Sequence, residues 1–295
     1  MTGATARESR PNVILCADDY ALSAGVSEAI RELAEQERLS ATSAIVTLDR
    51  WPEDARRLRA VRDRISLGLH INLTLGAPLG SIPSLAPDGR LPGLGSLLAR
   101  ALSRRIDRDE IAAEVTRQLV RFESELGFAP DHVDGHQHVH ALPGVRDGVL
   151  AALAARFPGR QPLVRNPADR ASSVLARRSA MGKTLLIAFL ASGFEGAART
   201  RGFPVNTSFT GVSSFDRRKS YTHELAAALS VTSRCHLIMC HPGHVDAALS
   251  SIDPIVARRE DEYDAIARYA ALPSLLWRPA RPKDGQPVNW QRIDA

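Results

Sequence analysis

Four of the nine histidines lie in one short segment, residues 132–140, together with a carboxylate. Imidazole is the commonest metal ligand in proteins, and a carboxylate often orients a ligating imidazole through its second ring nitrogen. Alternate side chains of an extended strand point to one face. We therefore expect one face of this segment to carry His132, Asp134, His136, His138 and His140. This density indicates a metal site rather than a solvated polar edge, although one segment cannot complete such a site.

Other polar residues follow segments that have the apolar character of buried strands. We predict strands at 12–17, 42–48, 64–74, 162–165, 202–206, 236–240 and around 275–277. Near the carboxyl ends of these segments lie Asp18, Asp19, His70, Asn72, Arg165 and His241. Because the carboxyl ends of parallel strands share one face, where active sites are built, we expect these residues to converge with Asp134 and His136.

The adjacent carboxylates of Asp18 and Asp19 allow two different roles. One can bind a metal while its neighbour takes a proton from water. Two imidazoles and one carboxylate leave open coordination positions, as catalytic metal sites do, and a histidine off the metal, such as His241, is a natural general acid. The alternative interpretations are an acidic pair at a helix N-terminus, a core histidine at position 70 and a simple turn after residue 240.

No motif in the chain favours a different chemistry. There is no Gly-x-Ser-x-Gly elbow, phosphate-binding Walker loop or dinucleotide fingerprint, and the three cysteines lack metal-binding spacing. Metal-assisted hydrolysis is the function that remains. Two alternatives stay open: a related metallohydrolase that cleaves a phosphoester or a cyclic amide, and a non-catalytic sugar- or lipid-binding module with a structural metal.

Strand-like and helix-like segments alternate seven or eight times, without a change of composition that would mark a linker. This alternation predicts a parallel sheet, and the length of 295 residues favours its closure into a (β/α) barrel. We predict one domain over residues 11–277, with loose termini at 1–10 and 278–295. A helix predicted over 171–201 contains the longest apolar run.

The composition is that of an ordinary globular protein, with 44% hydrophobic and 24% charged residues. The net charge of +5 is modest, and no basic run is interleaved with aromatics, so nucleic acid is not an expected partner. No apolar leader and no run of the ~20 apolar residues that a span needs is visible, which predicts a cytoplasmic protein. Peripheral membrane contact and a homodimer both remain compatible with the sequence.

Three segments together resemble the YdjC-like carbohydrate deacetylases. They read Ala17-Asp18-Asp19-Tyr20-Ala21-Leu22-Ser23, Gly68-Leu69-His70-Ile71-Asn72-Leu73-Thr74 and His132-Val133-Asp134-Gly135-His136-Gln137-His138-Val139-His140. His241-Pro242-Gly243 resembles the late His-Pro motif of the family, and the likeness covers about residues 11–250. Gly135 stands where many members have Ser.

The resemblance implies an irregular (β/α) barrel of the glycoside hydrolase/deacetylase type, and a metal-dependent hydrolase that removes N-acetyl groups from amino sugars. It implies that Asp19, His70 and His136 bind one divalent metal ion, that Asp18 is the base and that His241 is the acid. The nitrogen-rich ligand set favours Zn²⁺ over Mg²⁺, which prefers oxygen, but leaves Mg²⁺ open. We expect substrate contacts or support of the ligands from Asn72, Asp134, His138, His140 and Arg165.

Within this family, the chain most resembles the deacetylases associated with hopanoid biosynthesis. The segments 206–209 and 211–215 and the basic-and-apolar helix at 171–201 carry that narrower likeness. It implies that the substrate is an N-acetylglucosaminyl hopanoid, a sugar on a lipid. An apolar helix face rimmed by arginines could dock at a bilayer surface, or the helix could pack as an ordinary outer helix of the barrel.

Overall fold

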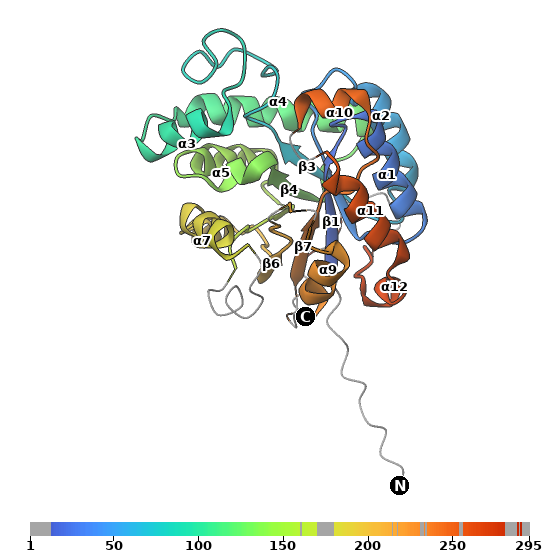
Figure 1. Ribbon diagram of the computed structural model, residues 1–295. Coiled ribbons are helices and arrows are strands. Elements are labelled where there is room, and N and C mark those ends of the chain that lie inside the picture. Colours follow the sequence, from blue (N-terminus) through green and yellow to red (C-terminus); the bar gives the residue numbers. More distant parts are fainter. Residues whose placement is uncertain are drawn as a thin grey trace.

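The computed structural model describes residues 13–159, 161–169, 180–213, 215–216, 218–230, 233, 235–253, 256–280, 288 and 290. Its centre is a sheet of seven parallel strands in the order β5-β4-β3-β2-β1-β7-β6, with helices around the outside (Figure 1). The strands are β1 Val13–Tyr20, β2 Ala41–Ala44, β3 Ser66–Ile71, β4 His132–Gly135, β5 Leu163–Val164, β6 Ser208–Thr210 and β7 His236–Cys240.

Strand β1 lies inside the sheet, between β2 and β7, and all eight of its residues are buried. Its first five residues are apolar, as expected for a strand covered on both faces. It pairs in parallel with β2 and β7. The register with β2 shifts between Ala17 and Tyr20, and Asp19 has a left-handed φ of 67°. The strand is therefore irregular at its two carboxylates.

Helices connect the strands and form the outer layer of the molecule. They are α1 Ala24–Glu35, α2 Trp51–Leu58, α3 Leu94–Leu102, α4 Arg108–Leu126, α5 Val145–Arg156, α7 Met181–Leu190, α8 Phe194–Thr200, α9 Tyr221–Leu229, α10 Ala247–Ile252, α11 Arg258–Arg268 and α12 Leu272–Leu275, with 3-10 turns η1 Arg59–Val61 and η2 His136–Ala141. Their ends follow the local sequence. Ser23 caps α1 by accepting a hydrogen bond from Val26 N, Asp107 caps α4 in the same way, and Gly127 ends α4 with a left-handed φ of 80°.

The two edge strands, β5 and β6, are joined by loop and side-chain hydrogen bonds rather than by a regular ladder. The backbone N–H of Val164 donates to the carbonyl of Pro204 at 2.9 Å. The buried Asn206 amide accepts from Asn166 N at 2.7 Å and donates to the carbonyls of Asn166 and Ser208. The sheet thus curls into an irregular (β/α) barrel, which confirms the predicted fold class.

Two strands predicted in the C-terminal third of the chain differ from the structure. The strand predicted at 202–206 is wrong, and β6 begins only at Ser208. The stretch contains Pro204, and the side chain of Asn206 bonds to the backbone that follows β5. The strand predicted around 275–277 is reduced to one bridge between Val13 and Leu276.

The helix predicted over 171–201 is two helices in its described part. Helices α7 and α8 are separated at residues 191–193, where Gly193 has a φ of 79° that favours glycine. Residues 171–179 lie outside the described residues.

The C-terminal segment is anchored at both of its described positions beyond residue 280. Val288 and Trp290 are buried, and both donate hydrogen bonds to Asp131. The indole of Trp290 also stacks on that of Trp277, with 4.8 Å between the ring centroids. The prediction of a loose tail over 278–295 is therefore wrong at these two residues, because apolar burial and hydrogen bonds hold them. Residues 1–10 lie outside the described residues.

A tightly packed glycine allows strand β3 to lie beside β4. Gly68 is paired with His132, and a Cβ built at Gly68 would lie 2.3 Å from His132 Nε2. We predict that Gly68→Ala lowers the free energy of unfolding by about 3 kcal/mol, because both strands are buried and neither can move aside. Gly95→Ala is the matched control, since a Cβ at Gly95 in α3 meets nothing within 4 Å. Urea unfolding of both variants measures the difference, and equal stabilities would contradict this explanation.

Candidate metal centre and active-site cavity

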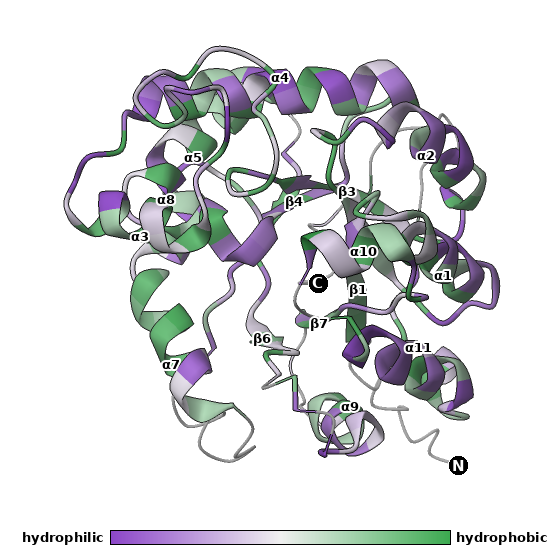
Figure 2. Ribbon diagram, turned by 45° about the horizontal axis from the view of Figure 1, so that its top comes forward, coloured by the Kyte–Doolittle hydropathy of each residue, from purple (hydrophilic) through white to green (hydrophobic). Residues whose placement is uncertain are grey.

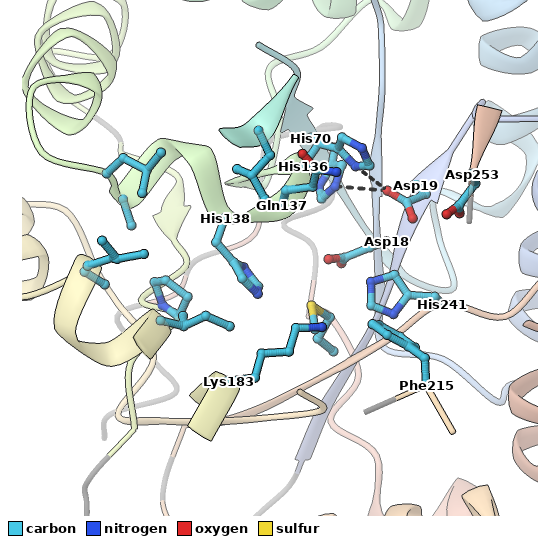
Figure 3. Close-up of a pocket in the computed structure, with 18 of the residues that line it drawn as sticks. Asp18, Asp19, His70, His136, Gln137, His138, Lys183, Phe215, His241 and Asp253 are labelled. Carbon is cyan, nitrogen blue, oxygen red and sulfur yellow. Dashed lines mark hydrogen bonds and ion pairs between the residues drawn. The ribbon is translucent and has the colours of Figure 1, made fainter. Parts of the chain in front are cut away.

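A cavity of about 340 Å³ opens among the loops that follow the carboxyl ends of the strands (Figure 3). Its polar side is lined by Asp18, Asp19, His70, His136, His138, His241, Asp253 and Arg259. The convergence that the sequence predicted for the residues after β1, β3, β4 and β7 is therefore present. Their chemical roles remain predictions.

Two imidazoles meet one carboxylate oxygen at the centre of this polar side. Asp19 Oδ1 lies 3.2 Å from His70 Nε2 and 3.0 Å from His136 Nδ1. The candidate ligand atoms of these three residues lie within 4.8 Å of one another. Two nitrogens and one oxygen gathered around one point, with the remaining directions facing a cavity, fit a catalytic divalent metal.

Surrounding side chains hold these three residues in place. The other nitrogen of His70, Nδ1, lies 2.6 Å from Asp134 Oδ1 and 3.0 Å from Ser43 Oγ. The other oxygen of Asp19, Oδ2, accepts a hydrogen bond from Arg259 Nη2 at 2.6 Å. A carboxylate that orients an imidazole from behind is the usual support of a metal-binding histidine. Asp134 therefore lies where the sequence suggested a supporting residue.

The electrostatics of the site favour a bound cation. Burial alone disfavours a charged imidazole, but the carboxylates of Asp134 and Asp19 outweigh it and raise the pKa of His70 to about 10. Burial would likewise raise the pKa of Asp19, yet Arg259 and the two imidazoles hold that pKa well below its usual range. The negative charge that keeps a proton on His70 also stabilises a metal ion that replaces this proton.

Asp18 is not the free carboxylate that the sequence suggested. Its two oxygens accept hydrogen bonds from Arg165 Nη1 and Nη2, both at 2.6 Å. Arg165 is fully buried, and its Nη2 also lies 2.5 Å from Asp134 Oδ2. A bidentate pair fixes the orientation of both groups and balances their charges. Asp18 is thus held in one direction at the edge of the cavity.

The prediction that residues 132–140 form one extended strand is wrong. Strand β4 ends at Gly135, and the 3-10 turn η2 follows, with left-handed φ values of 54° at Gln137 and 60° at His138. The turn folds back onto Gly135, where a Cβ would lie 2.8 Å from His140 Nδ1. The five polar side chains therefore cannot share one face.

Each of the other three histidines of this segment has its own surroundings. His132, in β4, does not line the cavity. Its Nδ1 lies 2.9 Å from the hydroxyl oxygen of Ser66 in β3. His138 lines the cavity, and burial holds its pKa well below the usual range. His140 Nε2 lies 2.8 Å from the carbonyl of Arg165 and so supports the residue that holds Asp18.

His241 reaches the cavity from the end of β7. Its backbone N–H donates to Glu262 Oε2 at 2.6 Å, and its ring packs edge-on against Phe215. Its Nδ1 has no hydrogen-bond partner among the described residues. Burial lowers the pKa of His241 to about 4, so the ring is neutral near pH 7 in the absence of ligands.

Asn72 has a different position from the one suggested by the sequence. Its amide donates to Thr47 Oγ1 and to the carbonyl of Leu75, and its oxygen accepts from the backbone of Thr74 and Leu75. It does not line the cavity. Asn72 therefore shapes the loop after β3.

Helix α11 supplies functional residues that sequence reasoning missed. Arg259 contacts Asp19 and also forms an ion pair with Asp253, and Glu262, one turn further on, holds the backbone of His241. Both helix residues are buried, and burial raises the pKa of Glu262 to about 7. The run Arg258 to Glu262 resembles a solvated charged face. Only the spacing of three, which puts Arg259 and Glu262 on one side of a helix, could have drawn attention to them.

The opposite side of the cavity is apolar. It is formed by α3, η2, α7 and α10 together with two residues near β6 and β7, and its side chains include Leu94, Leu98, Ala141, Leu142, Leu186, Ile187, Leu190, Phe215, Met239 and Ile252. Lys183 is the one charged residue of α7, and its ammonium lies 4.2 Å from the centroid of Phe215. The cavity therefore combines a charged floor with a large hydrocarbon wall.

Comparisons with known proteins agree with this architecture. A crystal structure from Enterococcus faecalis, described as a putative cellobiose-phosphate cleavage protein, shares the fold with a TM-score of 0.68 and 21% identity, over 92% of this chain and 98% of that one. A mouse carbohydrate deacetylase is 30% identical over 252 residues, which is 80% of this chain and 79% of its own. A chitooligosaccharide deacetylase of Klebsiella pneumoniae is 27% identical over 80% of this chain and 83% of its own. Since the family model described as YdjC-like protein matches residues 12–272, the chain belongs to the YdjC-like family.

Proposed function

We propose that this protein is a metal-dependent carbohydrate N-deacetylase. It removes the acetyl group from an N-acetylglucosamine-type sugar and releases acetate and a free amine. The observation that carries this proposal is the Asp19–His70–His136 cluster beside the arginine-held Asp18 and His241 in one cavity. The names of the mouse and Klebsiella relatives support the same activity.

In this proposal Asp19, His70 and His136 hold one divalent cation. When bound, the cation polarises the acetamide carbonyl and lowers the pKa of a bound water. The nitrogen-rich donors suit Zn²⁺ better than Mg²⁺. Arg259 and Asp134 fix the orientation of Asp19 and His70, so the cluster is arranged before a substrate arrives.

The remaining steps are proton transfers by two side chains. Asp18, oriented by Arg165, takes a proton from the attacking water. The hydroxide adds to the acyl carbon, and the C–N bond then breaks. As negative charge develops on the acyl group, the neutral His241 takes up a proton from water, and the resulting imidazolium protonates the departing nitrogen, because an amine leaves poorly as an anion. Asp18 later returns its own proton to water.

Arg165 also argues against a two-metal phosphoesterase. Among the described residues, the other clusters that could hold a metal are Cys16–His132–Asp134 and Asp18–His70–Asp134. Both include Asp134, which already forms an ion pair with Arg165, and Arg165 contacts Asp18 and Cys16 as well. A guanidinium thus occupies the position where a second cation would compensate these carboxylates.

We further propose that the amino sugar is carried on a lipid, as on a glycosyl hopanoid, and that the protein acts at the cytoplasmic face of a membrane. A sugar ring presents hydroxyls that need hydrogen-bond partners, and the leucine and isoleucine side chains of the apolar wall offer none. A hydrocarbon group beside the sugar fits this wall, because its burial there is favourable. The likeness of segments 206–209 and 211–215 to hopanoid-associated deacetylases supports the same substrate.

The two adjacent aspartates are predicted to respond differently to the same substitution. Asp19→Asn should lose bound metal, whereas Asp18→Asn should keep the metal and lose about 10²–10⁴-fold in kcat, the usual contribution of a general base. Metal analysis of purified protein and acetate release from N-acetylglucosamine oligomers measure both effects, with and without chelator. Asp264→Asn, at an exposed position, is the control. Metal loss in Asp18→Asn would reverse the two assignments.

The role proposed for His241 predicts a dependence on the leaving group. His241→Asn should slow amide hydrolysis about 10²-fold or more, but should affect an aryl acetate much less, since a phenolate leaves without protonation. Parallel kcat/KM measurements on an N-acetyl amino sugar and on p-nitrophenyl acetate test this expectation. An equal loss on both substrates would show that His241 is not the acid.

The apolar wall predicts a preference for hydrophobic aglycones. The octyl glycoside of N-acetylglucosamine should have a kcat/KM about tenfold or more above that of the methyl glycoside, because several methylene groups leave water. Leu98→Ser with Leu186→Ser should reduce this ratio and leave the methyl glycoside unaffected. Val120→Ser, in an exposed part of α4, is the control. Equal kcat/KM values for both glycosides in the wild type would contradict the proposal of a lipid-linked substrate, but not the proposal of deacetylase activity.

A further inference from the structure

Helix α7 exposes an unusual amount of hydrocarbon for an outer helix of a barrel. Of its ten residues only Thr184 is buried. Met181 is 40% exposed, Leu185 41%, Leu186 53% and Phe189 72%. Figure 2 shows α7 as a largely hydrophobic ribbon at the edge of the molecule. Exposed apolar side chains that gather in this way mark an interaction surface.

The apolar residues of α7 fall into two stripes. Leu186, Ile187 and Leu190 line the cavity at helical spacing, together with the charged Lys183. Met181, Leu185 and Phe189 are spaced by four and form a ridge that does not line the cavity. We call these three residues the outer ridge. A helix that is apolar on both its cavity side and its outer side is suited to an apolar environment outside the protein.

The exposed apolar surface is continuous with the substrate cavity. Leu94 in α3, Leu186 in α7 and Ile252 in α10 line the cavity and are also 38%, 53% and 38% exposed. Leu102, at the end of α3, is 56% exposed. The mouth of the cavity is therefore rimmed by hydrocarbon from three helices. An occupant of this rim must be apolar and must extend beyond the cavity.

The segments of the rim that contain α3 and α7 are rich in cationic residues. Residues 94–106, which contain α3, carry Arg100, Arg104 and Arg105 and no carboxylate. Residues 180–202, which contain α7 and α8, carry Lys183, Arg199 and Arg201 against one carboxylate, Glu195. These two segments thus carry six cationic residues and one anionic residue, compared with 38 to 33 in the whole chain, whereas α10 is flanked by Asp246 and Asp253. This excess complements an anionic surface.

We propose that the outer ridge of α7 inserts into the interfacial region of an anionic lipid bilayer, so that the cavity mouth opens at the membrane surface. Among the described residues no helix is long and apolar enough to cross a bilayer, and the ten residues of α7 span only ~15 Å. The helix therefore lies in the plane of the interface. This inference rests on the proposed function, because membrane binding would give the cavity access to a lipid-linked substrate. Its test requires no turnover.

The experiment is co-sedimentation of the full chain with vesicles of equimolar phosphatidylcholine and phosphatidylglycerol, compared with vesicles of phosphatidylcholine alone. The wild type should partition onto the anionic vesicles, and less so at high salt. The double variant Leu185→Ser with Phe189→Ser should lower this partitioning about tenfold or more, because it removes two apolar side chains that the bilayer would bury. Val120→Ser, an exposed apolar residue on α4 away from the rim, should bind as the wild type does.

The deacetylation of a water-soluble N-acetylglucosamine oligomer serves as the folding control. It should be unchanged in the double variant, because neither Leu185 nor Phe189 lines the cavity. Absence of wild-type binding to either vesicle, or equal binding by the double variant, would overturn the proposal. So would a dimer in sedimentation velocity that the double variant abolishes without any vesicle binding, since the ridge would then cover a second copy. Vesicle binding without deacetylase activity would overturn only the proposed function.

Discussion

The site depends on how β1 ends, with two successive carboxylates that reach the same cavity. In a regular strand, neighbouring side chains point to opposite faces. Here the register shift after Ala17 and the left-handed φ of Asp19 bring both Asp18 and Asp19 to the cavity wall. Aspartate tolerates this backbone region better than most residues, and such conformations are retained where the surroundings hold them.

Each of these carboxylates has its own buried arginine. Arg165 binds Asp18 and Arg259 binds Asp19, and both guanidinium groups are fully buried. Removing charges from water is costly, and it is tolerated only where geometry and hydrogen bonds are good. The two arginines come from opposite sides of β1 in the sheet order: Arg165 follows β5, and Arg259 lies in α11, which follows β7 and α10. The curl of the sheet therefore brings a cation to each carboxylate of β1, and the site is arranged before any ligand binds.

The positions of the principal site residues could be predicted from sequence because they depend on a simple rule. Apolar strands alternate with helices, so the polar residues after Cys16, Leu69, Val133 and Cys240 must meet at one end of a parallel sheet. The turn after Gly135 was not predictable in the same way. Alternating histidines fit a strand, whereas two residues at positive φ depend on a tight return onto a glycine.

The charged groups that support the site were the least visible in the sequence. Arg259 and Glu262 lie in a helix whose charges resemble a solvated surface, and only the tertiary structure turns them inward. The ion pair between Asp18 and Arg165 was not predicted, although both residues were expected in the site. Pairing between residues 147 positions apart depends on barrel closure, which is made through Asn166 and Asn206 rather than through a recognisable strand pattern.

The two sides of the cavity differ in how firmly the fold holds them. The charged side is built on strand ends and on buried ion pairs, so a change at Asp18, Asp134 or Arg165 disturbs several strands at once. Most of the apolar side comes from α3, η2, α7 and α10, which lie outside the sheet, and α7 is a short helix with one buried residue. Chemistry and substrate preference therefore rest on separate structures. Under the proposed function, changes in α3, α7 and α10 would alter the hydrocarbon wall without moving Asp18, Asp19 and His70, which lie on strands of the sheet.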